Sequence, residues 1–352
     1  MRIVVAPDKF AGTLTAVQAA DAIIEGWHSV SPGDDLISCP MADGGPGFVE
    51  VLEAGLGGEV IAVSTVGPLG EPQLGAVLLH EGTAYIESAH ACGLHLVPRD
   101  SATAEVASSA GVADLLVAAA GSGVDRIVVG VGGTASTDGG APMVARLREL
   151  VGAAADDPAT QLLPSQIELL VATDVDNPLL GATGAAPVFG PQKGADSDAV
   201  DRLEARLADW ALDSGSDPMA AGAGAGGGLA FGLYVLGGRR VPGIATCLDA
   251  VGIDAAIERA DLVITGEGSF DYQSLRGKVV SGVARRAAAK ARPCVVVAGR
   301  CDVGRREAAA HGVDEMWSLV EATGSVDEAM NRPYESLVSL AASVARAWSA
   351  SS

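Results

Sequence analysis

The stretch that decides the fold predicted for this chain is Leu262-Val263-Ile264-Thr265-Gly266-Glu267-Gly268-Ser269-Phe270-Asp271-Tyr272-Gln273-Ser274-Leu275-Arg276-Gly277-Lys278. An apolar run of strand length turns at glycine and is followed by carboxylates, an amide, hydroxyls and cations. Unbroken apolar runs are typical of buried parallel strands, and open α/β sheets bind ligands at the carboxyl ends of their strands. The pattern therefore predicts the edge of a functional site. The alternative is a connecting loop that caps a helix.

Four other apolar runs complete a sheet around this stretch. Strands are expected near residues 3, 37, 263, 295 and 317, with helices between them. Because alternating strands and helices form parallel sheets, the two chain ends would build one five-stranded parallel sheet. Residues 60–66 and 75–87 instead predict β-hairpins. We therefore predict one α/β domain from residues 1–60 and 245–352 and an inserted mixed α/β domain over 61–244, with ligands in the cleft between them.

Composition and charge exclude several classes of partner. The chain has 352 residues, 49% of them apolar and only 4% aromatic, with 46 glycines, which favours an α/β protein of two domains. A net charge of −21 argues against nucleic acid or an anionic membrane as partner, since both require a basic surface. The five scattered cysteines lack metal-site spacing and no signal-peptide pattern opens the chain. We expect a cytoplasmic protein with reduced thiols.

The few lysines are placed unusually. The 23 basic residues include only four lysines, and Lys9, Lys193 and Lys278 each lie in a polar turn that contains glycine. A lysine is a compact point charge, so its retention in such turns indicates binding of an anion. Chance placement of any one of them is the alternative.

Two glycine turns follow predicted strands. The first spans residues 41–48, after a strand at 36–40, and the second spans 132–140, after a strand at 127–131. Free backbone N–H groups and a helix dipole make a strand-to-helix turn a general anion site. The Gly-x-x-x-x-Gly-Lys-[Ser/Thr] and Gly-x-Gly-x-x-Gly patterns are both absent from the sequence. A nucleotide site here would therefore be neither a Walker P-loop nor a dinucleotide fingerprint.

Asp174 and Asp176 stand two residues apart after a predicted strand at 169–172. Side chains two apart on an extended segment point the same way. The two carboxylates could therefore share a Mg²⁺ ion or position a hydroxyl. A turn stabilised by Asx hydrogen bonds explains the pair equally well.

Taken together, the motifs resemble those of the bacterial two-domain glycerate kinases, of the glycerate 2-kinase type, over nearly the whole chain. The blocks that carry the resemblance are Ala6-Pro7-Asp8, Met41-Ala42-Asp43-Gly44-Gly45, Val66-Gly67-Pro68-Leu69-Gly70, Gly132-Gly133, Asp138-Gly139-Gly140, Asp174-Val175-Asp176-Asn177-Pro178-Leu179, Phe189-Gly190-Pro191-Gln192-Lys193-Gly194, Thr265-Gly266-Glu267-Gly268, Asp271, Gln273-Ser274-Leu275 and Gly277-Lys278. The resemblance implies a flavodoxin-like domain built from both chain ends, an inserted second α/β domain, and phosphorylation of a hydroxyl of D-glycerate with ATP and Mg²⁺.

The resemblance and the site chemistry together assign roles. Phosphoryl transfer needs cations for the phosphates and carboxylates for the metal and the nucleophile. We expect the catalytic residues to be Asp43, Asp174, Asp176, Glu267 and Lys278, with Asp174 and Asp176 as the metal ligands. We expect the substrate and the phosphates to be bound by Asp8, Lys9, Gly44, Gly45, Gly133, Thr134, Asp138, Asn177, Gln192, Lys193, Asp271, Gln273 and Ser274.

Five positions depart from the family pattern. The family usually has lysine at Ala11, glutamate at Pro46, a hydroxyl residue at Phe48, asparagine at Thr137 and arginine at Ser269. Loss of a charge from a phosphoryl-transfer site can cost several kcal/mol of transition-state stabilisation, although Lys9 could partly replace the cation missing at residue 11. Two alternatives follow: a family member that only binds nucleotide or hydroxy acid for regulation, and a kinase with a changed substrate. A homodimer is compatible with the sequence.

Overall fold

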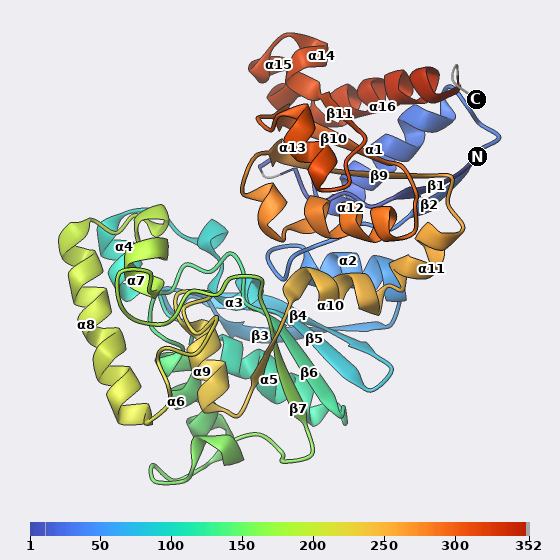
Figure 1. Ribbon diagram of the computed structural model, residues 1–352. Coiled ribbons are helices and arrows are strands. Elements are labelled where there is room, and N and C mark those ends of the chain that lie inside the picture. Colours follow the sequence, from blue (N-terminus) through green and yellow to red (C-terminus); the bar gives the residue numbers. More distant parts are fainter. Residues whose placement is uncertain (11, 350–352) are drawn as a thin grey trace. The chain divides into compact units, whose positions relative to one another are not determined.

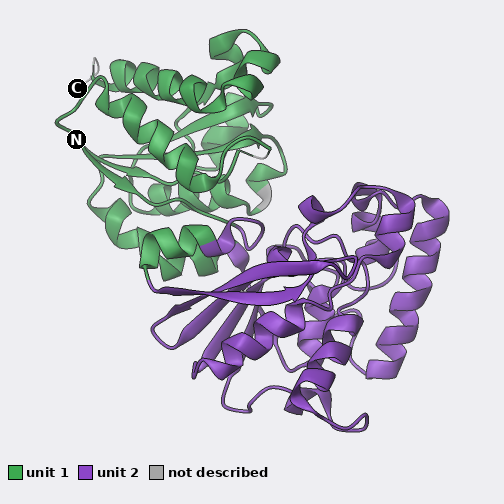
Figure 2. Ribbon diagram, turned by 180° about the vertical axis from the view of Figure 1, so that it is seen from behind, with its two compact units in different colours: residues 1–42, 50–57, 244–352 green, residues 43–49, 58–243 purple. Residues whose placement is uncertain are grey.

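The protein divides into two compact units. The computed structural model describes residues 1–10 and 12–349 (Figure 1). Unit 1 comprises residues 1–42, 50–57 and 244–352, and unit 2 comprises residues 43–49 and 58–243 (Figure 2). Unit 1 is thus discontinuous and is built from both chain ends. The glycine turn at 43–47 groups with unit 2, although the segments on either side of it along the chain belong to unit 1.

Unit 1 is an α/β unit with these elements: β1 Arg2–Val5, α1 Ala16–His28, β2 Asp35–Ser38, α2 Phe48–Leu56, α10 Gly243–Ala250, α11 Ile253–Glu258, β9 Leu262–Phe270, η4 Ser274–Arg276, α12 Val279–Ala289, β10 Cys294–Cys301, α13 Arg305–Ala310, β11 Glu315–Ser318, α14 Leu319–Thr323, α15 Val326–Asn331 and α16 Pro333–Ser349. The first residues of α2 and α10 group with unit 2.

The sheet of unit 1 has five parallel strands in the order β11-β10-β9-β1-β2. This confirms the predicted five-stranded parallel sheet built from both ends of the chain. One face packs on α1 and α16 through the apolar side chains of Ile3, Leu262, Ile264 and Val295 (Figure 1). Helix α12 packs against β9 and β10. Strand β1 pairs with β9 as far as Ile264, and β11 pairs with β10 as far as Ala298. The last residues of β9 and β10 pair with each other and so form one edge of the sheet.

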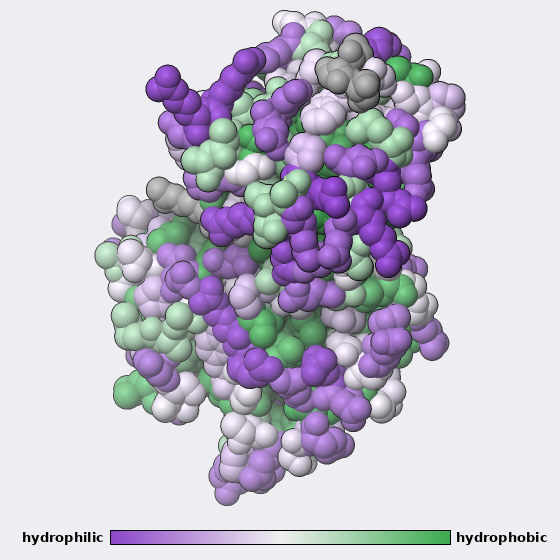
Figure 3. Space-filling view, turned by 45° about the vertical axis from the view of Figure 1, so that its right-hand side comes forward, coloured by the Kyte–Doolittle hydropathy of each residue, from purple (hydrophilic) through white to green (hydrophobic). Residues whose placement is uncertain are grey.

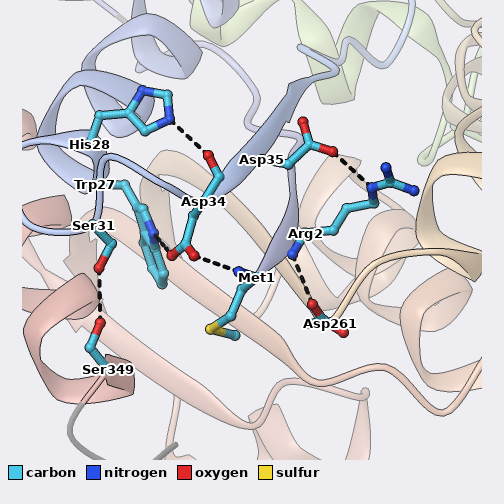
Figure 4. Close-up of polar contacts among 9 residues, drawn as sticks. All are labelled: Met1, Arg2, Trp27, His28, Ser31, Asp34, Asp35, Asp261 and Ser349. Atoms are coloured by element: carbon cyan, nitrogen blue, oxygen red, sulfur yellow. Dashed lines mark hydrogen bonds and ion pairs between the residues drawn. The ribbon is translucent and has the colours of Figure 1, made fainter.

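Polar contacts tie the start of the chain into this sheet (Figure 4). The carboxylate of Asp34 accepts a hydrogen bond from Trp27 Nε1 at 2.9 Å and another from the Met1 amino group. The Arg2 amide donates to Asp261 Oδ2 at 2.8 Å, just before β9 begins. These contacts help to set the register in which β1 lies beside β9, and so align the segments that follow the two strands.

Unit 2 contains these elements: β3 Glu59–Val66, β4 Pro72–His80, β5 Thr83–Glu87, α3 Ala89–Cys92, η1 Leu94–Leu96, α4 Ser101–Val106, α5 Val112–Gly121, β6 Arg126–Gly130, α6 Ala141–Val151, η2 Ala159–Gln161, β7 Glu168–Ala172, α7 Ala185–Phe189, η3 Pro191–Lys193, α8 Ser197–Ser214, α9 Leu229–Val235 and β8 Arg239–Val241. Its six-stranded sheet has the order β3-β4-β5-β6-β7-β8.

This second sheet is mixed. Strands β3, β4 and β5 are joined as antiparallel hairpins, as the sequence predicts, whereas β5, β6, β7 and β8 run parallel. Residues of β5, β6 and β7 pack with α5, α6 and α9 in a single apolar core. The parallel half therefore directs the carboxyl ends of β6 and β7 to one edge, where the glycine loop 132–140 and the segment that carries Asp174 begin.

The surface carries many polar groups. Figure 3 shows hydrophilic residues spread over one face, with hydrophobic residues in small groups between them. Within residues 1–10 and 12–349, no helix combines the length and the apolar character that a membrane span requires. The five cysteines are free thiols.

Candidate active site

In unit 1 the predicted residues gather beyond the end of β1, in the last part of β9 and in the turn that follows it, because β9 continues through the expected glycine turn as far as Phe270. The Ala6 amide donates to Ile264 O at 2.7 Å and the Asp8 amide to Gly266 O at 2.8 Å, which continues the pairing past the end of β1. Asp8 is thereby held beside the segment that carries Glu267. The Lys9 ammonium lies 3.7 Å from Asp8 Oδ1. Two acids and a cation therefore meet where the central strands end.

Glu267 is the most unusual group of this cluster. The residue is 6% exposed, and its Oε1 atom is buried without a hydrogen-bond partner among the described residues. Burial raises the pKa of this carboxyl from 4.5 to about 7, and the negative charges of Asp8 and Asp271 act in the same direction. Ser274 and Lys278 partly oppose the shift. A buried acid that titrates near neutral pH is able to exchange a proton with a ligand.

The segment that follows β9 is a hydrogen-bonded turn. Asp271 Oδ1 accepts from the amides of Gln273 at 2.7 Å and Ser274 at 3.3 Å, and the Asp271 amide donates to Ser274 Oγ at 3.2 Å. Ser274 is buried, whereas Gln273 is exposed. Lys278 lies just before α12 and is half-buried. Asp271 and Ser274 thus shape the turn that places Lys278 near Glu267, and any contact they make with substrate remains a prediction.

In unit 2 the first glycine turn is seated on the ends of β6 and β7. Gly44 O accepts from the Gly132 amide at 3.0 Å. Gly44 has φ +87°, and a Cβ atom there would lie 2.8 Å from Ala172 O, so only glycine fits. A Cβ atom on Gly243 would touch Asp43 O and lie 3.0 Å from Asp174 Oδ2. The structure therefore brings the predicted residues Asp43 and Asp174 to one place.

Glu87, which the sequence did not single out, holds this turn. Its Oε2 accepts from the amides of Gly47 at 2.9 Å and Val49 at 3.5 Å, at the start of α2. The side chain is buried. These amides were expected to be free for an anion, but a carboxylate of the protein occupies them. The sequence feature that could have indicated this role is the position of Glu87, a charged residue at the end of the buried strand β5.

We expect Glu87→Ala to destabilise unit 2. The substitution leaves the buried amide of Val49 and the partly buried amide of Gly47 without their acceptor, which costs about 1–3 kcal/mol. Glu87→Gln keeps one acceptor oxygen and should lose less. Denaturant unfolding of both variants, with Glu81→Ala on an exposed turn as control, measures the difference. Equal stability of Glu87→Ala and the control would contradict this role.

The second glycine loop, residues 132–140, is held by a buried lysine. Lys193 is 3% exposed, and its Nζ donates to Ser136 O, to Thr137 Oγ1 at 3.3 Å and to Thr134 Oγ1 at 3.4 Å. Gly227, at φ +68°, packs against this group, because a Cβ atom there would lie 2.6 Å from Nζ. Burial lowers the pKa of Lys193 to about 8, which leaves the ammonium largely protonated at neutral pH. Lys193 therefore contacts the loop directly.

A partly buried carboxylate holds the far end of the same loop. Asp138 Oδ2 accepts from the Ser109 amide at 2.7 Å, and Oδ1 accepts from the Gly140 amide at 3.0 Å, ahead of α6. Burial raises the pKa of Asp138, while those hydrogen bonds and the charge of Lys193 counteract the shift. A partly buried carboxylate and a buried ammonium thus fix the loop that contains Gly133 and Thr134.

Three other predicted residues lie on the surface or brace loops. Asp176 is exposed and forms an ion pair with Arg240, which the sequence did not indicate. Asn177 Nδ2 donates to Thr183 O at 2.8 Å, and Gln192 is exposed on η3. Across residues 1–10 and 12–349, no three His, Cys, Asp or Glu side chains form a group suited to a metal. Mg²⁺ usually takes only one or two carboxylates and completes its shell with phosphate and water.

The local structure accommodates most of the departures from the family pattern. Phe48 is fully buried, and its ring meets Tyr85 edge-to-face at 6.3 Å, so it is a core residue. Thr137 offers a hydroxyl to Lys193. Ser269 is exposed and pairs in register with Arg300 of β10. Pro46 packs on Gly133, and Ala11 lies outside the described residues.

Comparisons with known proteins identify the family. Residues 3–349 match the model of the glycerate kinase family. The chain is 37% identical to a glycerate kinase of Bacillus subtilis, with 95% of this chain and 94% of that protein covered. It is 35% identical to the glycerate 2-kinase of Escherichia coli, with 96% and 95% covered.

A solved structure shows the same architecture. It is assigned as glycerate kinase 2 of Salmonella typhimurium, is 35% identical in sequence and superposes with a TM-score of 0.79 over 100% of this chain and 99% of that one. The family match spans both units and includes the motif blocks described above. The chain therefore belongs to the glycerate kinase family and is a phosphotransferase of that family's type, with an alcohol group as acceptor.

Proposed function

We propose that this protein phosphorylates a hydroxyl of D-glycerate with ATP and Mg²⁺. The family match and the relatives named as glycerate kinases support the substrate, and the name of the Escherichia coli relative favours the 2-hydroxyl. The observation that carries the proposal within the molecule is Glu267, a buried carboxylate with one unpartnered oxygen and a pKa of about 7. Such a group suits the general base that receives the proton of an attacking hydroxyl.

The lysines of unit 1 supply positive charge beside this general base. Lys278 lies near Glu267, and Lys9 lies beside Asp8. Phosphoryl transfer gains most from positioning and from neutralising the charge of the phosphates. We assign Lys278 and Lys9 to phosphate oxygens of ATP, and Asp271, Gln273 and Ser274 to orientation of the substrate.

Unit 2 would bind the metal and further phosphate oxygens. Asp174, beside the Asp43 main chain, supplies one carboxylate, and Asp176 supplies a second once it leaves its exposed and therefore weak ion pair with Arg240. These carboxylates are a donor type that suits Mg²⁺, and the ion would help to neutralise the charge of the phosphates. The Gly44-Gly45 turn and the Gly133-Thr134 segment are assigned to phosphate contacts, with Asn177 and Gln192 beside them.

Lys193 and Asp138 support the second glycine loop within the protein. Binding of the ligands between the two domains, as the sequence predicts, and a cytoplasmic location are part of the same proposal.

The test is a coupled ADP-release assay with ATP, Mg²⁺ and D-glycerate. We expect turnover on the order of 1 s⁻¹ or more in the wild type. Lys278→Ala should lower kcat by roughly 100-fold or more, because a charge that stabilises the transition state is lost. Lys290→Ala, which removes an exposed lysine at the end of α12, is the matched control. Turnover of Lys278→Ala within a few-fold of wild type would remove Lys278 from the mechanism.

A further inference from the structure

A row of side chains continues past Glu267 onto the neighbouring strand. Leu262 and Ile264 face the core formed with α1 and α16, so by the alternation of a strand Glu267 and Ser269 lie on the opposite face of the sheet. The register of β10 places Ala298 beside Glu267 and Arg300 beside Ser269. Arg300 therefore shares the face of Glu267, one strand over and two residues farther along. Strand spacing and rise put the two Cα atoms about 8 Å apart.

The guanidinium of Arg300 is available for a ligand. Its side chain is 61% exposed, and Nη2 lies 2.7 Å from Asp302 Oδ2, which is itself 43% exposed. An ion pair between exposed side chains contributes little, so exchanging Asp302 for another anion costs little. The planar guanidinium matches a carboxylate with two parallel hydrogen bonds, whereas lysine offers only a point charge. Arg300 is thus suited to a carboxylate, and Lys9 and Lys278 are suited to phosphates.

We propose that Arg300 binds the carboxylate of the hydroxy-acid substrate and so directs its hydroxyl toward Glu267. This inference rests on the proposed function and adds the group that would select an acid over a neutral alcohol. A three-carbon hydroxy acid is short enough to present its carboxylate to Arg300 while its hydroxyl meets Glu267. Arg300 comes from the end of β10, outside the segment in which the sequence located the site.

The first experiment separates the two substrates. Arg300→Ser should raise the KM for D-glycerate roughly 10- to 100-fold, the usual effect of losing a charged hydrogen-bonded pair. The KM for ATP should stay within about twofold, since the phosphates bind elsewhere. Arg300→Lys should retain part of the affinity. Arg305→Ala, an exposed arginine at the start of α13, is the control and should leave both constants unchanged.

The second experiment moves the guanidinium by one strand. Ser269→Arg combined with Arg300→Ser exchanges the residues of one register pair on the same face. The KM of the double variant for D-glycerate should be at least about tenfold lower than that of Arg300→Ser, because the cation shifts by only about 4.8 Å. No rise in the KM for D-glycerate in Arg300→Ser, or a rise confined to ATP, overturns the inference.

Direct binding distinguishes failure of the inference from failure of the proposed function. If the wild type shows no turnover, calorimetric titration with D-glycerate still reports on Arg300. Binding that weakens in Arg300→Ser and not in Arg305→Ala supports the carboxylate site although the proposed kinase reaction fails. Absence of binding, or equal binding by wild type and Arg300→Ser, overturns the carboxylate site itself.

Discussion

Glu267→Gln is expected to lower kcat roughly a thousandfold, within the range for loss of a general base. Glutamine keeps the size of the side chain but cannot accept a proton at neutral pH. In the wild type, kcat/KM should rise with pH through about 7 and level off above it, since the base is active only as the carboxylate. A coupled assay between pH 5.5 and 9, in roughly half-unit steps around the expected pKa, measures this rise of kcat/KM with pH. Glu267→Gln should not show the rise.

The same substitution should make the fold more stable at alkaline pH. The folded pKa of Glu267 lies at about 7, above its ordinary value of 4.5, because burial penalises the charged form. Its contribution to stability is therefore fully present below pH 4.5 and is lost as pH rises through 7. The shift corresponds to about 3 kcal/mol above that range. Glu267→Gln removes the ionisation and should raise the unfolding midpoint at pH 8.

The combination of lower activity and higher stability is the distinguishing result. Glu258→Gln, at an exposed position on α11, is the control and should change neither property. A Glu267→Gln protein with near wild-type kcat would exclude the general-base role. A variant that is less stable at pH 8 would show that the buried carboxylate has a partner that compensates its charge.

Lys193→Met should destabilise unit 2 by about 3–5 kcal/mol, the usual effect of removing one partner from a buried charged network. Methionine fills a similar volume but makes no hydrogen bond to Ser136 O or Thr137 Oγ1. Asp138 also loses the positive charge that favours its ionised form. Hydrogen exchange of peptides from the 127–140 segment should report the change locally, because the loop would open more often.

A double variant tests whether the two buried charges act together. Asp138→Asn removes the negative charge and keeps an oxygen that can accept from the Gly140 amide. The Asp138→Asn/Lys193→Met protein should lose less stability than the sum of the single variants, since neither charge is then left alone. Lys290→Met serves as the surface control. Protection of the loop equal to that of this control would show that Lys193 does not hold it.

Local patterns explain what could be predicted from the sequence. The apolar runs near residues 3, 263 and 295 gave the strands of unit 1, because burial on both faces leaves no room for polar residues. Thr15 caps α1 within a capping box that includes Gln18, a contact between residues only three positions apart. The hairpins of β3, β4 and β5 followed from turns at glycine.

Contacts between distant segments could not be predicted in the same way. Lys193 was expected to meet an anion, but its acceptors lie on a loop more than fifty residues earlier in the chain. Glu87 reaches back to the turn before α2, and Arg240 pairs with Asp176 on a separate segment. The alignment of Arg300 with Ser269 depends on the register in which β9 and β10 pair. Periodicity in one stretch carries no information on such pairings.

The discontinuous sheet of unit 1 has a consequence for biosynthesis. Strand β1 emerges from the ribosome early, yet one of its two neighbours in the sheet, β9, is made only after all of unit 2. Domains tend to fold as units during synthesis, so unit 2 can complete its core while β1 and β2 still wait for β9, β10 and β11. During that interval the nascent chain exposes an apolar strand edge. Chaperone contact with the growing polypeptide should therefore concentrate on its first forty or so residues and end when the last strands emerge.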